Sequence, residues 1–163
     1  MAVSSTPMDL TRAAHVGISA SDLGASIAFC KALTGREPGV ADETMHSVPF
    51  SRSQGPPVAK PRYATVDLDD IGIDLIRFQE PLGERTNGAA NRPGSMHPRF
   101  KADDFDAVHQ SMKEAGRNFL GADHTLLAGE VTPDEALGTR VAYFNDPDGT
   151  GLEIVRTEGG SSN

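Results

Sequence analysis

Two histidines and two carboxylates occupy matching positions in the two halves of this 163-residue sequence. His15 opens the alternating stretch HVGIS, and Asp74 lies in the later stretch IDLI. His97 and Glu153 stand in the same relation, with Glu153 inside LEIV. On a strand, each carboxylate would point to the face opposite its large aliphatic neighbours. Nitrogen and oxygen ligands of this kind suit a divalent transition metal that keeps positions open for water or substrate.

The repetition carries more weight than any single residue. A lone histidine at the start of a strand is more often a surface residue, and the motif DPDG alone is simply a turn. Unrelated surface residues would rarely take the same placement twice, so the match favours a shared metal site. Glu153 poses a particular question, because a glutamate inside an apolar run needs a partner for its charge. We expect the metal to be that partner.

Each histidine begins a strand that leads into a helix. In HVGISASDLGASIAFCKALTG, Ser21 or Asp22 caps the helix and Gly35 ends it. In HPRFKADDFDAVHQSMKEAG, the cap is Asp103 or Asp104 and the helix ends at Gly116. The apolar stripes predicted for the two helices are Leu23, Ile27, Cys30 and Leu33 in the first, and Phe105, Val108, Met112 and Ala115 in the second.

Three further strand signals follow each helix. They lie near 43–50, 62–68 and 71–78 after the first helix, and near 118–121, 139–144 and 151–156 after the second. The sequence therefore predicts an α+β fold of two paired βαβββ modules, in which each sheet packs its convex face on its own helix. The concave faces would form an open, barrel-like mixed sheet around a metal cavity.

The domain boundaries follow from composition. We predict one domain over 12–157, with modules 12–80 and 95–157 and a polar linker 81–94, and flexible ends at 1–11 and 158–163. Two soft segments, RSQGPPVAK and LLAGEVTPDEALG, are long enough to be binding loops.

Charge and cysteine content exclude several function classes. A formal charge of −8 argues against a nucleic-acid partner or an acidic membrane surface. A single cysteine, Cys30, forms no internal disulfide and fits a reducing compartment. No secretory h-region or membrane-spanning run is visible. We expect a soluble cytoplasmic protein whose partner is a small molecule.

The segments HVGISASDLGASIAF, GIDLIRF, HPRFKADDFDAV and RVAYFNDPDGTGLEIV resemble the vicinal oxygen chelate superfamily, also called the glyoxalase/bleomycin-resistance/dioxygenase fold. The resemblance covers about 12–157. It implies that His15, Asp74, His97 and Glu153 ligate a divalent ion (Zn, Ni, Co, Mn or Fe), to which two adjacent substrate oxygens bind. It also implies a homodimer, with modules that pair within one chain or across two.

Three residues depart from the family pattern. Asp74 stands where glutamate is usual, and its shorter side chain would leave His15, His97 and Glu153 as a triad if it reaches the metal only through water. Pro98 cannot donate to a sheet ladder, so the strand after His97 must start late or lie at an edge. Cys30 replaces a helix aromatic, which we interpret as a packing change.

The expected chemistry is Lewis-acid polarisation of a carbonyl, with an enolate stabilised as charge develops. Glu153 is the first candidate base, Asp74 the second, and Tyr143 a hydrogen-bond donor or weak acid. Arg99 would pair with an anionic group of the substrate. Counting by twos along the strands, the other predicted lining residues are Gly17, Ser19, Ile76, Phe78, Val141, Gly151 and Val155.

Three functions fit these residues. The first is a metal-dependent lyase or isomerase, similar to glyoxalase I or acyl-CoA epimerases, acting on a small carbonyl or hydroxy-carbonyl compound. The second is an Fe(II)-dependent extradiol dioxygenase, which usually needs a further histidine; His46, His109 and His124 are not obvious candidates. The third is a metal-free binding or resistance protein, which retention of all four ligands argues against. Fold resemblance alone does not choose among them.

Overall fold

The computed structural model describes the chain except for residues 1–11, 42–46, 56–57, 87, 133 and 158–163. The predicted flexible ends and His46 therefore lie outside the described residues. Within the described part, no helix is both long and apolar enough to cross a membrane. The chain divides into two compact units, the first comprising Met1–Leu23 with Arg36–Pro81 and the second Gly24–Gly35 with Leu82–Asn163.

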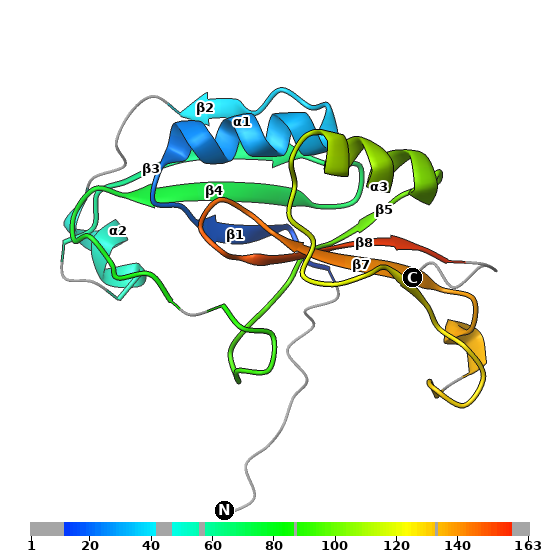
Figure 1. Ribbon diagram of the computed structural model, residues 1–163. Coiled ribbons are helices and arrows are strands. Elements are labelled where there is room, and N and C mark those ends of the chain that lie inside the picture. The colour runs from blue at the N-terminus through cyan, green and yellow to red at the C-terminus, as the bar shows by residue number, and fades with distance from the viewer. Residues whose placement is uncertain (1–11, 42–46, 56–57, 87, 133, 158–163) are drawn as a thin grey trace, which may run out of the picture. The chain divides into compact units, whose positions relative to one another are not determined.

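The first unit is built on a four-stranded mixed sheet (Figure 1). Its order is β1-β4-β3-β2, with β1 parallel to β4 and the other pairs antiparallel. One face is apolar and buried, as strand alternation predicts, and it includes Val66, Ile73 and Leu75. The strands are β1 (His15–Ser19), β2 (Gly39–Ala41), β3 (Pro61–Asp67) and β4 (Gly72–Phe78).

The second unit repeats this topology, with the order β5-β8-β7-β6 and β5 parallel to β8. The predicted short strand near 118–121 is reduced to one bridge between Phe119 and Phe144. The α+β class with two mixed sheets is thus confirmed, and the described strands close no barrel. The strands are β5 (Arg99–Lys101), β6 (His124–Thr125), β7 (Arg140–Asn145) and β8 (Gly151–Arg156).

Two of the helices follow the predicted start and stop signals. In α3 (Phe105–Glu114), the Asp104 carboxylate accepts a hydrogen bond from the Ala107 N–H at 3.0 Å. In α1 (Leu23–Thr34), the helix stops before Gly35, which takes a positive φ of 68°. A short 3₁₀ helix, η1 (Asp134–Ala136), lies in the second predicted soft segment.

A helix replaces part of the strand predicted near 43–50. Residues 42–46 are outside the described part, but α2 (Val48–Ser53) is helical. The hydroxyl of Ser47 accepts a hydrogen bond from the Phe50 N–H at 3.2 Å, and Pro49 occupies the first turn. Serine at the cap with proline just inside the helix is a start signal. That signal outweighs the short apolar alternation on which the strand prediction depended.

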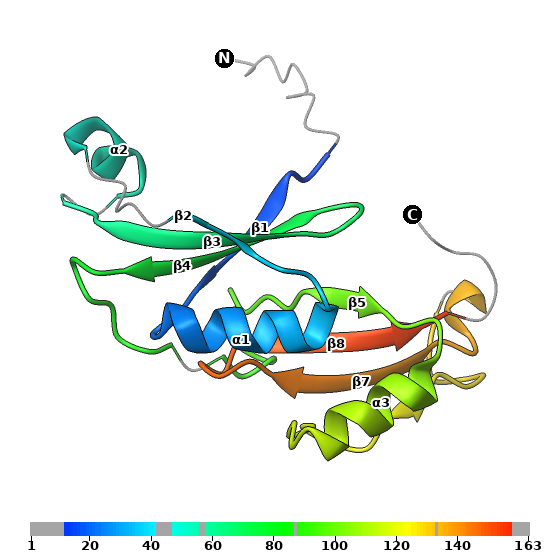
Figure 2. The ribbon, with the colours of Figure 1, turned by 90° about the horizontal axis from the view of Figure 1, so that it is seen from above.

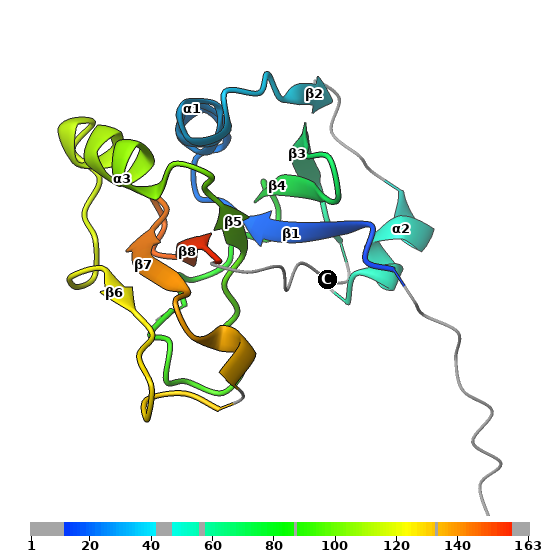
Figure 3. The ribbon, with the colours of Figure 1, turned by 90° about the vertical axis from the view of Figure 1, so that its right-hand side faces the viewer.

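Helix α1 belongs to the second unit, which contradicts the expectation that each sheet packs on its own helix. The Phe29 ring lies 6.5 Å from the Phe144 ring of β7, and the Arg117 guanidinium lies over Phe29 at 4.6 Å. Figures 2 and 3 show α1 and α3 on the same side of the second sheet. The core of that unit is therefore built from both long helices.

The buried stripe of α1 also differs from the predicted one. Leu23 and Cys30 are buried as predicted. Ser26 and Phe29 are buried with them, whereas Ile27 and Leu33 are only half-buried. The helical spacing of apolar residues predicted that Ile27 would be buried. In the structure, α1 instead packs in the second unit through Phe29, whose ring lies near that of Phe144. The helix is therefore rotated toward Phe29.

Cation–π contacts and ion pairs hold helix α3 against the second sheet. Phe105 is fully buried, and its ring lies under the Arg140 guanidinium at 4.6 Å. Arg140 also pairs with Asp106 of the helix at 2.8 Å and with Asp123 at 2.7 Å. His109 is buried beside this network, 4.3 Å from the Phe119 ring, and its Nε2 has no hydrogen-bond partner.

Candidate functional site

In the first unit, the predicted ligands His15 and Asp74 lie next to one another. The distance between His15 Nε2 and Asp74 Oδ2 is 3.5 Å. The Thr65 hydroxyl donates to the other carboxylate oxygen, Oδ1, at 2.7 Å. Thr65 is placed to do this because it is the cross-strand partner of Asp74 in the β3–β4 pair. The carboxylate is thus held through one oxygen and offers the other to the histidine.

The second unit contains the same arrangement with a buried acid. The distance between His97 Nε2 and Glu153 Oε2 is 3.2 Å. Arg99 donates to Oε1 from Nε at 3.1 Å and from Nη2 at 3.0 Å. The Glu153 side chain is only 2 % exposed, while His97 and Arg99 are about half-exposed.

Arg99 supplies the charge partner that the buried glutamate requires. Sequence reasoning assigned that role to a metal and assigned Arg99 to an anionic substrate group. The structure instead pairs the guanidinium with Glu153, through the parallel β5–β8 register in which Arg99 lies opposite Glu153. A carboxylate this deeply buried is retained only when paired or hydrogen-bonded. The metal is therefore not needed to explain the buried charge.

Pro98 shapes the entry to this strand as expected. Strand β5 begins at Arg99, so His97 precedes the ladder. The Pro98 carbonyl still accepts a hydrogen bond from the Glu153 N–H at 3.1 Å. This bond fixes the backbone beside His97, because proline can accept in a ladder although it cannot donate.

The two units share one register around their acids. Asp74 lies between Gly17 on β1 and Thr65 on β3. Glu153 lies between Arg99 on β5 and Tyr143 on β7. The units therefore differ at equivalent positions: glycine against arginine on one side, threonine against tyrosine on the other.

Tyr143 lies over the second pair. Its ring meets the His97 ring edge-on, with centroids 5.6 Å apart. Burial raises the pKa of the Tyr143 hydroxyl, and the Glu153 charge and a hydrogen bond to that carboxylate raise it further. Tyr143 therefore stays protonated at neutral pH, and its hydroxyl is a hydrogen-bond donor.

The other predicted lining residues fall on the faces that alternation assigned to them. Ser19 is registered with Ile76 on the same face as Asp74, with Phe78 two residues beyond. Val141 is registered with Val155 on the same face as Glu153. Their contact with a substrate stays a prediction.

Each imidazole–carboxylate pair has the donor chemistry that a divalent metal requires, and the His97–Glu153 pair also has the spacing. Two ligands bound at roughly 2.1 Å lie about 3.0–3.4 Å apart across one tetrahedral or octahedral edge. The His97–Glu153 distance falls in that range, and the 3.5 Å separation of His15 and Asp74 is just outside it. Among the described residues, no cluster of three or more His, Cys, Asp or Glu side chains is present. Each unit thus offers two ligands that fit.

The remaining described histidines lie elsewhere. His109 is buried in the α3 core, and His124 Nε2 pairs with Glu130 at 2.8 Å. The contacts described for His109 and His124 do not include any residue of the two imidazole–carboxylate pairs. The second unit therefore gives no sign of the additional histidine that ring-cleaving dioxygenases usually need.

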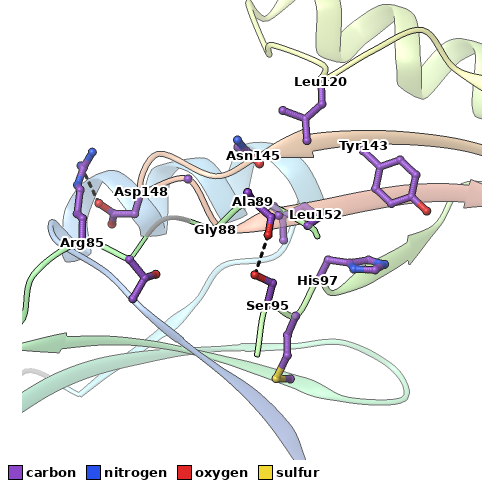
Figure 4. Close-up of a pocket in the computed structure, with 15 residues that line it drawn as sticks. Arg85, Gly88, Ala89, Ser95, His97, Leu120, Tyr143, Asn145, Asp148 and Leu152 are labelled. Carbon is purple, nitrogen blue, oxygen red and sulfur yellow. Dashed lines mark hydrogen bonds and ion pairs between the residues drawn. The ribbon is translucent and has the colours of Figure 1, made fainter. Parts of the chain in front are cut away.

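A pocket of about 460 Å³ adjoins His97 and Tyr143 within the second unit (Figure 4). Much of its wall comes from the segment predicted to be a linker. Arg85 Nη2 pairs with Asp148 Oδ1 at 2.8 Å and so joins this segment to the DPDG turn. The lining residues are Arg85, Thr86, Gly88, Ala89, Ala90, Ser95, Met96, His97, Leu120, Tyr143, Asn145, Asp148, Gly149, Gly151 and Leu152.

Sequence reasoning missed this wall because the segment is polar and rich in glycine. One signal was available, since the second aspartate of DPDG, Asp148, offers a carboxylate with which a cation from elsewhere in the chain can pair. No signal in the sequence indicated the close approach of Gly88 to the Gly149 carbonyl. A Cβ on Gly88 would lie 2.7 Å from that oxygen. Only the folded chain shows it.

Comparisons with known proteins agree with this fold. A glyoxalase family protein from Bacillus cereus is 16% identical, with a TM-score of 0.71, and the match covers 97% of this chain and 100% of that one. The fosfomycin resistance protein FosX from Mesorhizobium loti is 18% identical, with a TM-score of 0.55 and coverage of 93% and 94%. The oxidase ChaP-H2 is 23% identical, with a TM-score of 0.54 and coverage of 94% and 99%. No match was found among curated proteins.

At these low identities the solved structures show that the fold is shared, and they give no information about the activity of this chain. The sequence itself matches a family model over residues 12–154, nearly the whole of the described chain. The chain therefore belongs to the Glyoxalase/Bleomycin resistance protein/Dioxygenase superfamily.

Proposed function

We propose that this protein is a metal-dependent lyase or isomerase that acts on a small carbonyl or hydroxy-carbonyl compound. The observation that carries the proposal is the Glu153 carboxylate, buried with Oε1 on Arg99 and Oε2 facing His97. A carboxylate fixed in this way is preorganised to bind a ligand through one oxygen. The superfamily generally uses divalent metals and is mostly enzymatic, which supports the same function.

His15, Asp74, His97 and Glu153 are the four residues that would hold the ion. When bound, the metal supplies a Lewis acid that polarises a substrate carbonyl. The proposal needs both pairs, because each unit by itself has only two ligands. Modules that pair within one chain, or across two chains of a homodimer, would satisfy it equally.

The chain's own residues provide for proton transfer and orientation. Glu153 and Asp74 are the candidate bases that remove a proton beside the carbonyl. Asp74 is the more accessible of the two, with a 21 % exposed side chain. Tyr143, held protonated, donates its one proton to Glu153 in the free protein and to a substrate oxygen when the substrate displaces that contact. Arg99 keeps the Glu153 carboxylate in place.

The alternatives in the same family have less support. One observation favours an iron-dependent dioxygenase. The short Asp74 side chain is already hydrogen-bonded by Thr65, and if it does not ligate, the remaining ligands are two histidines and one carboxylate. The dioxygenase loses weight because His109 and His124 have other partners. A metal-free binding protein would have no need of two imidazole–carboxylate pairs in the same register.

Metal content of the purified protein tests the proposal. We expect stoichiometric Zn, Ni, Co or Mn by mass spectrometry, lost on chelation and restored on reloading, and loss of that metal in His15→Ala and in Glu153→Ala. His124→Ala is the matched control, because His124 is an exposed histidine in an ion pair with Glu130. Iron with oxygen consumption would establish the dioxygenase, and failure to take up any added ion would overturn the proposal. Homodimer formation and a cytoplasmic location stay predictions.

A further inference from the structure

The pocket of the second unit has its formal charges paired. Arg85 and Asp148 line it and form an ion pair with each other at 2.8 Å. Its other titratable lining residues are His97, whose Nε2 faces Glu153, and Tyr143, which stays protonated. Arg99, the residue that sequence reasoning assigned to an anionic group, is absent from the described lining and donates to Glu153.

The wall near His97 is apolar and open. Met96 is 71 % exposed, Leu120 60 % and Tyr143 40 %, and all three line this one pocket. Scattered exposed apolar residues are ordinary, but several gathered around a concavity mark a ligand site. Figure 4 shows Leu120 and His97 on either side of Tyr143, while Arg85 and Asp148 lie together at the other end.

The remaining polar groups suit hydrogen bonding to a neutral ligand. The Ser95 hydroxyl already donates to the Ala89 carbonyl at 2.9 Å, and Asn145 provides an amide. Small residues such as Gly88 and Gly151 leave room along the wall. Among the described lining residues, a charged ligand group would meet only charges that already have an opposite partner.

We infer that this pocket binds the uncharged, largely apolar body of the substrate. A carboxylate- or phosphate-bearing tail is disfavoured. The inference rests on the proposed function only for the carbonyl that would lie beside His97 and Tyr143. The volume of about 460 Å³ is within the usual range for small-molecule sites, about 300–1,000 Å³. The Arg85–Asp148 pair is the specificity-determining feature, because it removes the cation that an anionic tail would require.

A pair of matched probes tests the charge preference. The neutral probe is 2-hydroxyacetophenone, and the anionic probe is the same molecule with a 4-carboxylate on the ring. Binding to the full chain is measured by calorimetry, and the Met96 methyl shift in NMR places the ligand in the pocket. We expect the neutral probe to bind about tenfold more tightly, and equal or tighter binding of the carboxylate would overturn the inference.

Two variants then move the preference in opposite directions. Asp148→Asn releases the Arg85 cation, so affinity for the carboxylate should rise about three- to tenfold with the neutral probe unchanged. Arg85→Gln removes the positive charge and keeps the negative charge of Asp148, so the carboxylate probe should bind more weakly still. Asp69→Asn, which breaks the exposed Arg36–Asp69 pair of the first unit, is the control and should change neither affinity. If neither pocket variant alters the carboxylate affinity, the pair does not set specificity.

The measurements are made in chelator and again after metal loading, which separates this inference from the proposed function. Neutral preference in both states with no metal uptake would retain the pocket and reject the metal enzyme. Metal uptake with a preference for the carboxylate would do the reverse.

Discussion

The Arg99–Glu153 pair allows a quantitative prediction about Arg99→Met. Methionine keeps an unbranched apolar stem and removes both hydrogen bonds to Glu153 Oε1. Removing one partner of a fully buried pair costs about 3–5 kcal/mol. The Arg99 side chain is 52 % exposed, so water can take part of its place. We therefore expect a loss of about 2–3 kcal/mol in the free energy of unfolding.

The assay is urea unfolding at pH 7.5 in chelator, with the slope m compared between variants. Arg36→Met is the matched control. Arg36 makes a similar contact with Asp69 at 2.8 Å, but Asp69 is 87 % exposed. An exposed pair of this kind contributes about 0–1 kcal/mol.

A double-mutant cycle identifies the cause. A Glu153→Gln background removes the buried charge at this position, so Arg99→Met should cost no more than about 1 kcal/mol there. The reasoning is refuted if Arg99→Met costs no more than Arg36→Met in the wild-type background. It is equally refuted if the cost is unchanged in the Glu153→Gln background, because charge compensation would then not be its origin.

Three further predictions concern the second unit. Phe29→Ala should cost about 3–5 kcal/mol in urea unfolding, because the ring is 5 % exposed and contacts the second sheet. Burial, followed by the charge of a nearby lysine, lowers the pKa of His109 from 6.5. As the pH drops, the unfolded state therefore takes up the proton before the folded state does. The free energy of unfolding should fall below pH 6.5 and level off beneath the pKa of His109 in the folded state. His109→Leu should abolish this slope in unfolding curves measured from pH 8 to 5. Gly88→Ala should lower stability by about 1–3 kcal/mol and weaken 2-hydroxyacetophenone binding, because a Cβ would meet the facing carbonyl at 2.7 Å. Gly83→Ala, with nothing within 4 Å, should change neither.

Local patterns in the sequence determined most of the strands and the two long helices, but β2 and β6 were not predicted. Alternation predicted β1, β3, β4, β7 and β8 to within a residue or two, and Asp104 and Gly35 mark helix ends as capping rules require. Pro98 correctly indicated a late start for β5. These features depend on neighbours a few residues apart, and such neighbours are visible in the sequence.

The repeat also placed one imidazole beside one carboxylate in each unit. His15 contacts Asp74, and His97 contacts Glu153, although the members of each pair are 56 or more positions apart in the sequence. Period-two alternation and a parallel first–last strand pair are sufficient for that, because they fix both face and neighbour.

Tertiary structure alone decided which surfaces meet. It placed Phe29 of α1 against Phe144, gave Glu153 the guanidinium of Arg99 as its partner, and turned the predicted linker into a pocket wall through Arg85. Arg99 and Glu153 are 54 positions apart. Alternation places Arg99 on the same face as His97, but it does not show that the guanidinium pairs with Glu153 rather than with a ligand. Charge and packing partners across such distances are chosen by the free energy of the whole fold, in which a buried carboxylate must find a cation wherever the chain brings one near.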